Sequence, residues 1–138
     1  MSHSTKLTPP PKVQQMNFVP VVLKLKETYS LWQNYLPHFA KQSRHTLGRR
    51  IDETCLNALE YSFLASYSAS SDKIIFIDRA ISRVDLIKIL LLLAWECQFL
   101  DTKKYTHIST LLEETGRMLG AWKRQQIQKT PFVKKGEK

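Results

Sequence analysis

The fold class follows from residues 73–99, which read KIIFIDRAISRVDLIKILLLLAWECQF. Apolar side chains recur there at spacings of three and four, which is the period of an α-helix with one face against a core. The first residues, Ile74 to Ile77, also have the β-branched content of a strand. The helical period nevertheless continues as far as Trp95, so the segment predicts one long helix.

Two segments before it carry the same period. Residues 20–40 begin with a proline, which suits the first turn of a helix because the missing N–H needs no partner there. Pro37 is expected to end the regular helix near Tyr35. Residues 44–67 follow Ser43, a candidate N-cap, and their apolar residues form one broad stripe.

A fourth helix is predicted over residues 102–126, with Thr102 as its candidate N-cap. Four helices joined by short connections predict an all-α fold, an antiparallel four-helix bundle over residues 19–126. Residues 1–18 are polar and include three consecutive prolines, so we expect a flexible basic arm. Residues 127–138 are expected to form a basic C-terminal tail.

The third predicted helix has more apolar surface than a monomer needs. Leu90 to Leu93 are four consecutive leucines, and they point to every side of a helix. A helix that is apolar nearly all round has to be covered nearly all round, whereas each helix of a monomeric bundle keeps one face in water. We therefore expect a homo-oligomer. The alternative is an unusually wide core.

Composition places the chain among small globular proteins. Its 138 residues are 43% hydrophobic and include only 4 glycines, which excludes collagen-like and low-complexity classes. Cys55 and Cys97 lie in apolar stretches and are expected to be buried, reduced thiols. No hydrophobic signal segment opens the chain, and no apolar run approaches the roughly 20 residues that span a bilayer. A soluble cytoplasmic protein without membrane contact is expected.

The positive charge is concentrated in two parts of the chain. The sequence has 21 basic and 12 acidic residues, a net charge of +9. Residues 1–50 contain 8 basic and 1 acidic residue, and residues 123–138 contain 6 basic and 1 acidic residue, whereas residues 51–122 are net acidic. Such segregation is typical of a surface that binds polyanions, most simply nucleic acid. Solubility alone is the alternative.

The densest basic cluster is KQSRHTLGRR, residues 41–50, at the start of the second predicted helix. Unpaired N–H groups and the helix dipole favour anions there, and guanidinium groups suit bidentate contact with phosphate. For Arg49 and Arg50, ion pairing with Asp52 and Glu53 is an equally good alternative. The candidate nucleic-acid-binding residues of this cluster are Lys41, Arg44, His45, Arg49 and Arg50.

Two smaller groups of basic residues lie further along the chain. One precedes the lysine-rich tail, and lysines there make salt-sensitive phosphate contacts without reading bases. The other occupies one face of the third predicted helix, where Asp78 and Asp85 are near enough to neutralise it. Binding is therefore expected to be electrostatic and low in sequence preference. The candidate residues of the two groups are Lys123 and Arg124, and Arg79 and Arg83.

No catalytic, metal or cofactor site is recognisable in the sequence. Gly48 is followed by two arginines rather than by the Lys-Ser or Lys-Thr of a phosphate-binding loop. His38 and His45 have no carboxylate near them between Glu27 and Asp52 to complete a metal site. No serine or cysteine stands in a nucleophile constellation. The protein is expected not to be an enzyme and to use neither metal nor cofactor.

Aromatic residues and glycines at helical spacing have structural interpretations. Tyr29, Trp32 and Tyr35 are expected to belong to the core rather than to a platform on which bases stack. Gly116 and Gly120 are four apart on one helix face, and because glycine disfavours a helix interior, they are expected to permit a close helix approach. Fraying at Gly120 is the alternative.

Four stretches carry a family resemblance: LPHF at 36–39, RHTLGRRI at 44–51, RVDLIKIL at 83–90 and ETGRMLGAW at 114–122. Together they resemble the accessory variability determinant (Avd) family of diversity-generating retroelements, over about residues 20–125. The most specific parts are the Thr-Leu-Gly of the second stretch and the Gly-Arg-Met-Leu-Gly-x-Trp of the last. Ala121 stands where the family often has glycine, another small residue.

The resemblance implies four-helix subunits that assemble into a homopentameric barrel with a basic surface. It also implies binding to nucleic acid and to the element's reverse transcriptase, in a complex that copies a template-repeat RNA into mutagenic cDNA and diversifies a target gene. We therefore expect a non-catalytic accessory subunit that supports mutagenic retrohoming. A general RNA-binding or ribosome-associated four-helix protein and a protein-interaction adaptor remain alternatives.

Overall fold

The computed structural model describes residues 18–129, and every regular element in that range is helical. Four long helices account for most of it: α2, Pro20–Tyr35; α3, Arg49–Tyr67; α4, Ser70–Glu96; and α5, Thr102–Gln128. The prediction of an all-α fold is confirmed. Residues 1–17 of the predicted arm and residues 130–138 of the predicted tail lie outside the described residues.

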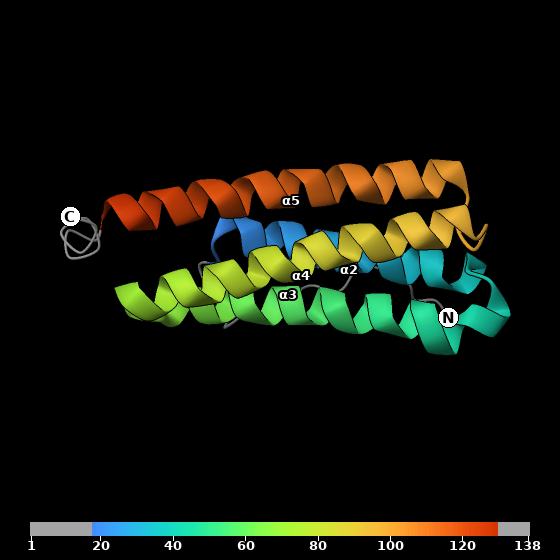
Figure 1. Ribbon diagram of the computed structural model, residues 1–138, viewed down its shortest axis with the longest axis horizontal. Coiled ribbons are helices and arrows are strands. Elements are labelled where there is room, and N and C mark those ends of the chain that lie inside the picture. Colours follow the sequence, from blue (N-terminus) through green and yellow to red (C-terminus); the bar gives the residue numbers. More distant parts are fainter. Residues whose placement is uncertain (1–17, 130–138) are drawn as a thin grey trace, which may run out of the picture.

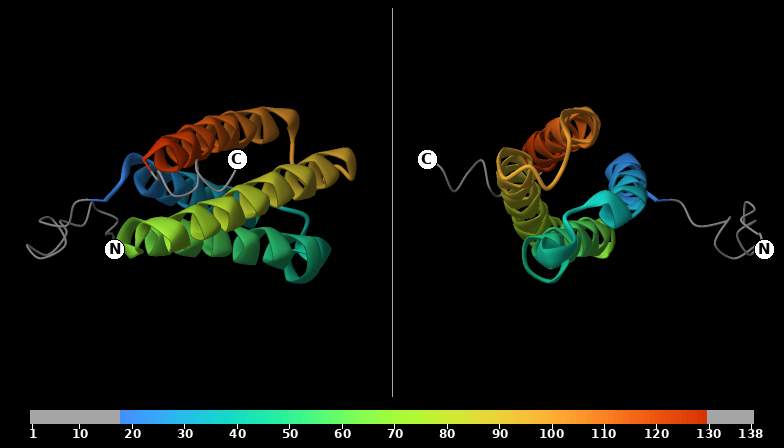
Figure 2. Two further views of the ribbon diagram at one scale, coloured as in Figure 1. Left: turned by 60° about the vertical axis from the view of Figure 1, so that its left-hand side comes forward. Right: turned by 90° about the vertical axis from the view of Figure 1, so that its right-hand side faces the viewer.

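The helices run alternately up and down and form a closed ring of four (Figures 1 and 2). Each helix packs against its neighbour in the chain, and α5 returns to pack against α2. One end of the bundle therefore contains the 36–48 connection and the turn between α4 and α5. The other contains the start of α2, the turn between α3 and α4, and the end of α5. The predicted antiparallel four-helix bundle is confirmed for one chain.

The core contains side chains from all four helices. Trp32, Ile51, Ile87 and Leu112 are fully buried, one from each helix, and burial of an apolar side chain of this size stabilises a fold by roughly 1.5–3 kcal/mol. Trp32 belongs to the core as predicted. The apolar faces found by helical periodicity are the faces that meet inside the ring.

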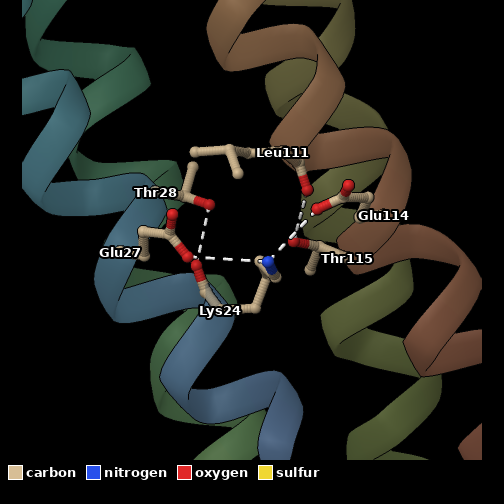
Figure 3. Close-up of polar contacts among 6 residues, drawn as sticks. All are labelled: Lys24, Glu27, Thr28, Leu111, Glu114 and Thr115. Atoms are coloured by element: carbon tan, nitrogen blue, oxygen red, sulfur yellow. Dashed lines mark hydrogen bonds and ion pairs between the residues drawn. The ribbon is translucent and has the colours of Figure 1, made fainter.

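A polar bridge joins the first and last helices of the ring (Figure 3). The Lys24 ammonium on α2 lies 3.2 Å from the Glu114 carboxylate on α5 and 3.5 Å from Glu27 on its own helix. The hydrogen bond with Glu114 raises the pKa of Lys24 above its ordinary value. The Thr28 and Thr115 hydroxyls beside the bridge donate to backbone carbonyls of their own helices. The bridge therefore marks the contact that closes the bundle.

The helix that follows Tyr35 is interrupted as Pro37 predicted. Residues Leu36–His38 and Lys41–Ser43 form short 3₁₀ turns, and Arg44–Gly48 forms a π-helical turn that leads into α3. Ser43 precedes that turn, but its side chain caps no N–H. The regular α-helix therefore begins five residues later than predicted.

The α4–α5 connection corrects two further predictions. Helix α4 begins at Ser70 and ends at Glu96, three residues earlier at each end than predicted. The N-cap of α5 is Asp101 rather than Thr102, because the Asp101 carboxylate accepts a 2.9 Å hydrogen bond from the Lys104 N–H. This bond and the Lys104 side chain lower the pKa of Asp101 below its ordinary value.

The turn after α4 has the hydrogen bonds of a Schellman motif. The Phe99 N–H donates to the Ala94 carbonyl at 2.8 Å, and the Gln98 N–H donates to the Trp95 carbonyl at 3.0 Å. Between them Gln98 adopts a φ of 66°, the left-handed conformation that glycine usually supplies at this position. Within residues 18–129, no other residue has a positive φ.

The leucine-rich part of α4 is partly exposed in the single chain. Leu91 is fully buried, whereas Leu93 is 44% exposed and Ile89 is 60% exposed. The bundle therefore leaves apolar surface of α4 uncovered, and the alternative of an unusually wide core is wrong for these two side chains. None of the helices in the described part of the chain is both long enough and apolar enough to cross a membrane.

The two cysteines differ in environment. Cys55 is buried on α3, and burial raises the pKa of its thiol to about 12. Cys97 lies in the α4–α5 turn and is exposed. The prediction of two buried thiols is therefore wrong for Cys97, because α4 ends before it.

Candidate nucleic-acid interface

The cationic cluster of residues 41–50 lies at the end of the bundle formed by the 36–48 connection (Figure 1). Phe39 anchors that connection, because its side chain is buried. The centroid of its ring lies 5.6 Å from that of Trp32 and 5.7 Å from that of Phe99. Gly48 permits the tight turn, because a Cβ there would lie 3.3 Å from the Ser43 carbonyl oxygen and near two apolar side chains. The backbone carrying the cluster is thus fixed by core contacts.

Arg44 is tied to that connection rather than free at the surface. Its Nη2 donates a hydrogen bond to the Pro37 carbonyl oxygen. Its Nε is buried and has no hydrogen-bond partner among residues 18–129. A guanidinium held in this way stabilises the turn between α2 and α3, so Arg44 serves the fold of the cluster as well as its charge.

An open cavity of about 510 Å³ lies beside Arg44, between α2 and the start of α3. His45 and Arg49 contribute to its lining on the α3 side. Asp52 also lines it and accepts hydrogen bonds from the Trp32 indole at 3.2 Å and from Gln33 at 2.7 Å. The alternative of ion pairing with the arginines therefore does not hold for Asp52 within residues 18–129, where these neutral donors contact it.

Arg49 and Arg50 have different surroundings. Arg49 lies 3.5 Å from Glu53 one turn later, and both side chains are more than half exposed. Such solvated pairs contribute little. Arg50 and Lys41 are exposed and form no ion pair with any residue in the range 18–129. The ion-pairing alternative therefore holds for Arg49, whereas the charges of Arg50 and Lys41 have no acidic partner within residues 18–129.

The second group lies near the opposite end of the bundle. Lys123 on α5 is 2.8 Å from Asp78 on α4. Arg124 is exposed and lines an open apolar cavity of about 600 Å³ between the start of α2 and the end of α5. Lys123 therefore joins two helices, and Arg124 remains available to an external anion.

The α4 group is not neutralised in the way the spacing predicted. Asp78 pairs with Lys123, and Asp85 lies 3.9 Å from Lys88. The Arg79 guanidinium lies over the rings of Tyr61 and Phe76, 5.9 and 5.8 Å from their centroids. These contacts hold the charge of Arg79 against an aromatic surface without compensating it.

The structure brings together some of the nine predicted residues and separates others. Five of them lie in the 41–50 segment. The ion pair between Lys123 and Asp78 brings Lys123 close to the part of α4 that carries Arg79. Helix α5 has 27 residues, which corresponds to about 40 Å at 1.5 Å per residue. Arg83 lies at the middle of α4, and the other candidates form two cationic regions near opposite ends of the bundle rather than one patch.

Arg117 and Lys103 are among the exposed cations that the sequence-based prediction did not select. Arg117 has no acidic partner in the described part of the chain, because Glu113 lies 3.6 Å from Lys88 and Glu114 pairs with Lys24. Lys103 is also exposed, at the start of α5. A lysine in the first turn opposes the helix dipole, and that unfavourable placement is the signal that could have singled it out.

No three His, Cys, Asp or Glu side chains within residues 18–129 come together in a way that could hold a metal ion. The site instead offers guanidinium, ammonium and imidazole groups on rigid helical turns. Such groups can bind phosphate.

The comparisons with known proteins point to one family. A family model described as bAvd-like matches residues 21–126, which include all four helices except the outermost residues of α2 and α5. No curated protein and no solved structure matches the chain.

Proposed function

Because the chain belongs to the bAvd-like family, we propose that it is a non-catalytic accessory subunit of a diversity-generating retroelement. In this role it binds nucleic acid and associates with the element's reverse transcriptase. Its proposed ligands are the template-repeat RNA and the cDNA copied from it. The protein supports mutagenic cDNA synthesis and retrohoming by positioning strands beside the polymerase in the cytoplasm.

The observation that supports this proposal most directly is the set of uncompensated cations. Lys41 and Arg50 at one end, and Arg124 near the other, are exposed and pair with no acid in the described residues. An exposed cation without a carboxylate partner keeps its N–H donors for an external anion. Phosphate contacts of this kind supply affinity without sequence preference.

Self-association is part of the same proposal. Ile89 and Leu93 lie four residues apart on α4 and are 60% and 44% exposed, so they share one face of the helix. We propose that a second copy covers this face in a homo-oligomer, with the pentameric barrel that the family resemblance implies. Such an assembly would repeat the cationic regions around a ring and multiply the contacts with one nucleic acid.

The test is a salt titration of binding to nonspecific RNA and DNA with two matched charge reversals, Arg50→Glu and Arg117→Glu. Both residues are exposed helical arginines without an ion pair in the described part of the chain. At low salt, we expect Arg50→Glu to weaken binding more than Arg117→Glu does. Arg50→Glu should also reduce the magnitude of the slope of log affinity against log salt concentration by about 0.7–0.9 for each phosphate that is no longer neutralised. Circular dichroism should show unchanged helicity.

Four outcomes would contradict the proposal. Equal effects of the two reversals would assign binding to net charge rather than to the 41–50 cluster. Absence of binding even at low salt would favour a protein-interaction adaptor. Binding without any association with the reverse transcriptase would favour a general RNA-binding protein. Turnover by the purified protein without the polymerase would contradict the non-catalytic role.

A further inference from the structure

A cavity at the turn between α4 and α5 is unused by the cationic clusters. It has a volume of about 720 Å³ and is lined by the end of α4, by the start of α5 and by His38 of the 36–48 connection. It therefore lies at the same end of the bundle as residues 41–50 (Figure 1). The contact between Phe39 and Phe99, 5.7 Å between ring centroids, joins the connection to this turn.

Trp95 gives the cavity a rigid aromatic wall. Its indole N–H donates a 3.0 Å hydrogen bond to the Thr102 hydroxyl, and its ring stacks on Tyr105 at 5.5 Å with an interplanar angle of 19°. The side chain is nevertheless 38% exposed. An indole that is fixed in orientation, backed by a second ring and open to solvent is suited to stacking with a planar ligand, and every nucleobase has such a face.

Gln98 gives the cavity a polar group at a cost in backbone energy. It lines the cavity in the left-handed conformation, with a φ of 66°, where glycine would avoid the strain. Backbone strain of this kind is often found where a side chain has a function. An amide offers both donors and an acceptor, the combination needed to contact the edge of an unpaired base.

The cavity is lined by acidic residues, whereas basic residues lie close to it. Glu96 and Asp101 both line it, and two carboxylates disfavour a phosphate inside. Asp101 accepts hydrogen bonds from the Lys104 N–H and ammonium. Exposed cations without ion pairs in the described range lie close by in the chain, Lys41 three residues after His38 and Lys103 two residues after Asp101. A strand could therefore place its base in the cavity and its phosphates on these lysines.

We infer that the cavity between Trp95, Gln98 and His38 holds an unpaired base of a single-stranded nucleic acid, stacked on the indole and contacted at its edge by the Gln98 amide. This inference rests on the proposed function and deepens it, because it names single strands as the preferred ligand. A duplex cannot use the site, since its bases are already stacked and paired.

The experiment measures fluorescence anisotropy of labelled 12-nucleotide RNA and DNA of mixed sequence, as single strands and as blunt duplexes. Trp95→Ala should weaken single-strand binding about 5- to 150-fold, the effect of losing one base–aromatic stack, and should change duplex binding less than twofold. Trp122→Phe is the matched control, because Trp122 lies near the opposite end of the bundle and lines the α2–α5 cavity. It should leave both affinities unchanged.

A second variant keeps the inference testable if Trp95→Ala disturbs the turn. Gln98→Gly relieves the left-handed strain, so its thermal stability should equal or exceed that of the wild type. It should also weaken single-strand binding, because the amide is lost. Unchanged single-strand affinity in a folded Gln98→Gly protein would overturn the role of the amide.

The remaining outcomes distinguish the inference from the proposed function. If Arg50→Glu weakens all binding while Trp95→Ala changes none, the inference fails and the proposed function stands. If Trp95→Ala weakens single strands and duplexes equally, its role is structural and the inference fails. If Trp95→Ala alters the mass of the oligomer but not its affinity, a second copy covers the indole and the inference fails. If the wild type binds no nucleic acid at low salt, both fail.

Discussion

Single residues in the 36–48 connection and in the α4–α5 turn form the contacts that hold these connections in place. Arg44, for example, is a cation whose Nη2 is bound to the Pro37 carbonyl oxygen and whose Nε is buried. Its replacement by a carboxylate would both reverse a charge and remove the contact that holds the turn. A loss of nucleic-acid binding in Arg44→Glu would therefore not separate charge from folding, whereas exposed Arg50 allows that separation.

Asp101 provides a pH-dependent test at the residue scale. Its folded-state pKa is lowered by hydrogen bonds from Lys104, so its capping contribution is fully present above the unfolded pKa of the carboxyl and is lost as the pH falls through the lower, folded pKa. Asp101→Ala should lower the melting temperature at pH 7, and the difference from the wild type should shrink in acid.

Thermal melts followed by circular dichroism between pH 7 and pH 2 would measure this difference. Asp101→Asn is the control, because asparagine also caps helices but does not ionise in this range. A gap between wild type and Asp101→Ala that stays constant through the acid range would contradict capping by the ionised carboxylate.

At the scale of the helix, the glycines of α5 do not serve the close approach expected of them within one chain. A Cβ at Gly116 would meet only the end of the Lys88 side chain, at 3.2 Å, and a Cβ at Gly120 would meet only Arg124 of the same helix, at 3.6 Å. The predicted close helix approach is therefore wrong for the described chain. Lys88 can move, and Arg124 lies at an ordinary contact distance.

Gly120→Ala should accordingly stabilise the isolated bundle by up to about 1 kcal/mol, the difference in helix propensity. Chemical denaturation gives the free energy of unfolding of both proteins. A decrease in stability would mean that something packs closely on this face of α5, and comparison at two protein concentrations would tell whether that is another copy of the chain.

The helices were predictable because their signals are local. Apolar periodicity located all four, and Pro37 located the end of α2. The connections were harder to predict. Asp101 and Thr102 are adjacent and both suit an N-cap, and only the backbone conformation decides that Asp101 is the cap. The ion pairs were hardest: Asp78 has Arg79 beside it in sequence but pairs with Lys123 from another helix. Sequence spacing indicates ion pairs within one helix, whereas pairs between helices depend on how the helices pack.

The candidate site was predictable in composition but not in arrangement. The 41–50 cluster forms one region because its residues are continuous in the chain, whereas nothing local indicated that Arg79 and Lys123 share the other end. The Trp95 cavity had no sequence signal of its own. Its wall depends on a stack with Tyr105 across the turn, and helical periodicity alone assigned Trp95 to the core.

For the whole molecule, the exposed apolar residues of α4 predict the assembly. Ile89→Glu with Leu93→Glu should reduce the mass in solution to that of one chain, because two carboxylates cannot be buried unpaired in an interface. The single chain should stay helical, since the Ile89 and Leu93 side chains are already 60% and 44% exposed in it. Light scattering combined with size-exclusion chromatography measures the mass.

Ser30→Glu with Asn34→Glu is the matched control for this experiment. It adds the same charge at the same spacing to exposed positions on α2, and its mass should equal that of the wild type. A wild-type protein that is monomeric at all accessible concentrations, or a double α4 variant of unaltered mass, would contradict assembly through this face.

The separation of the two cationic regions sets a length scale for the ligand. Lys123 lies 21 residues after Thr102, the first residue of α5, which is about 30 Å at 1.5 Å per residue, and successive base pairs of a duplex advance about 3.4 Å along each strand. A straight duplex must therefore be about 9 base pairs long before one molecule can contact both regions of a subunit. If the protein binds nucleic acid as proposed, a shorter duplex contacts one region only, and a longer duplex contacts both regions of the same subunit.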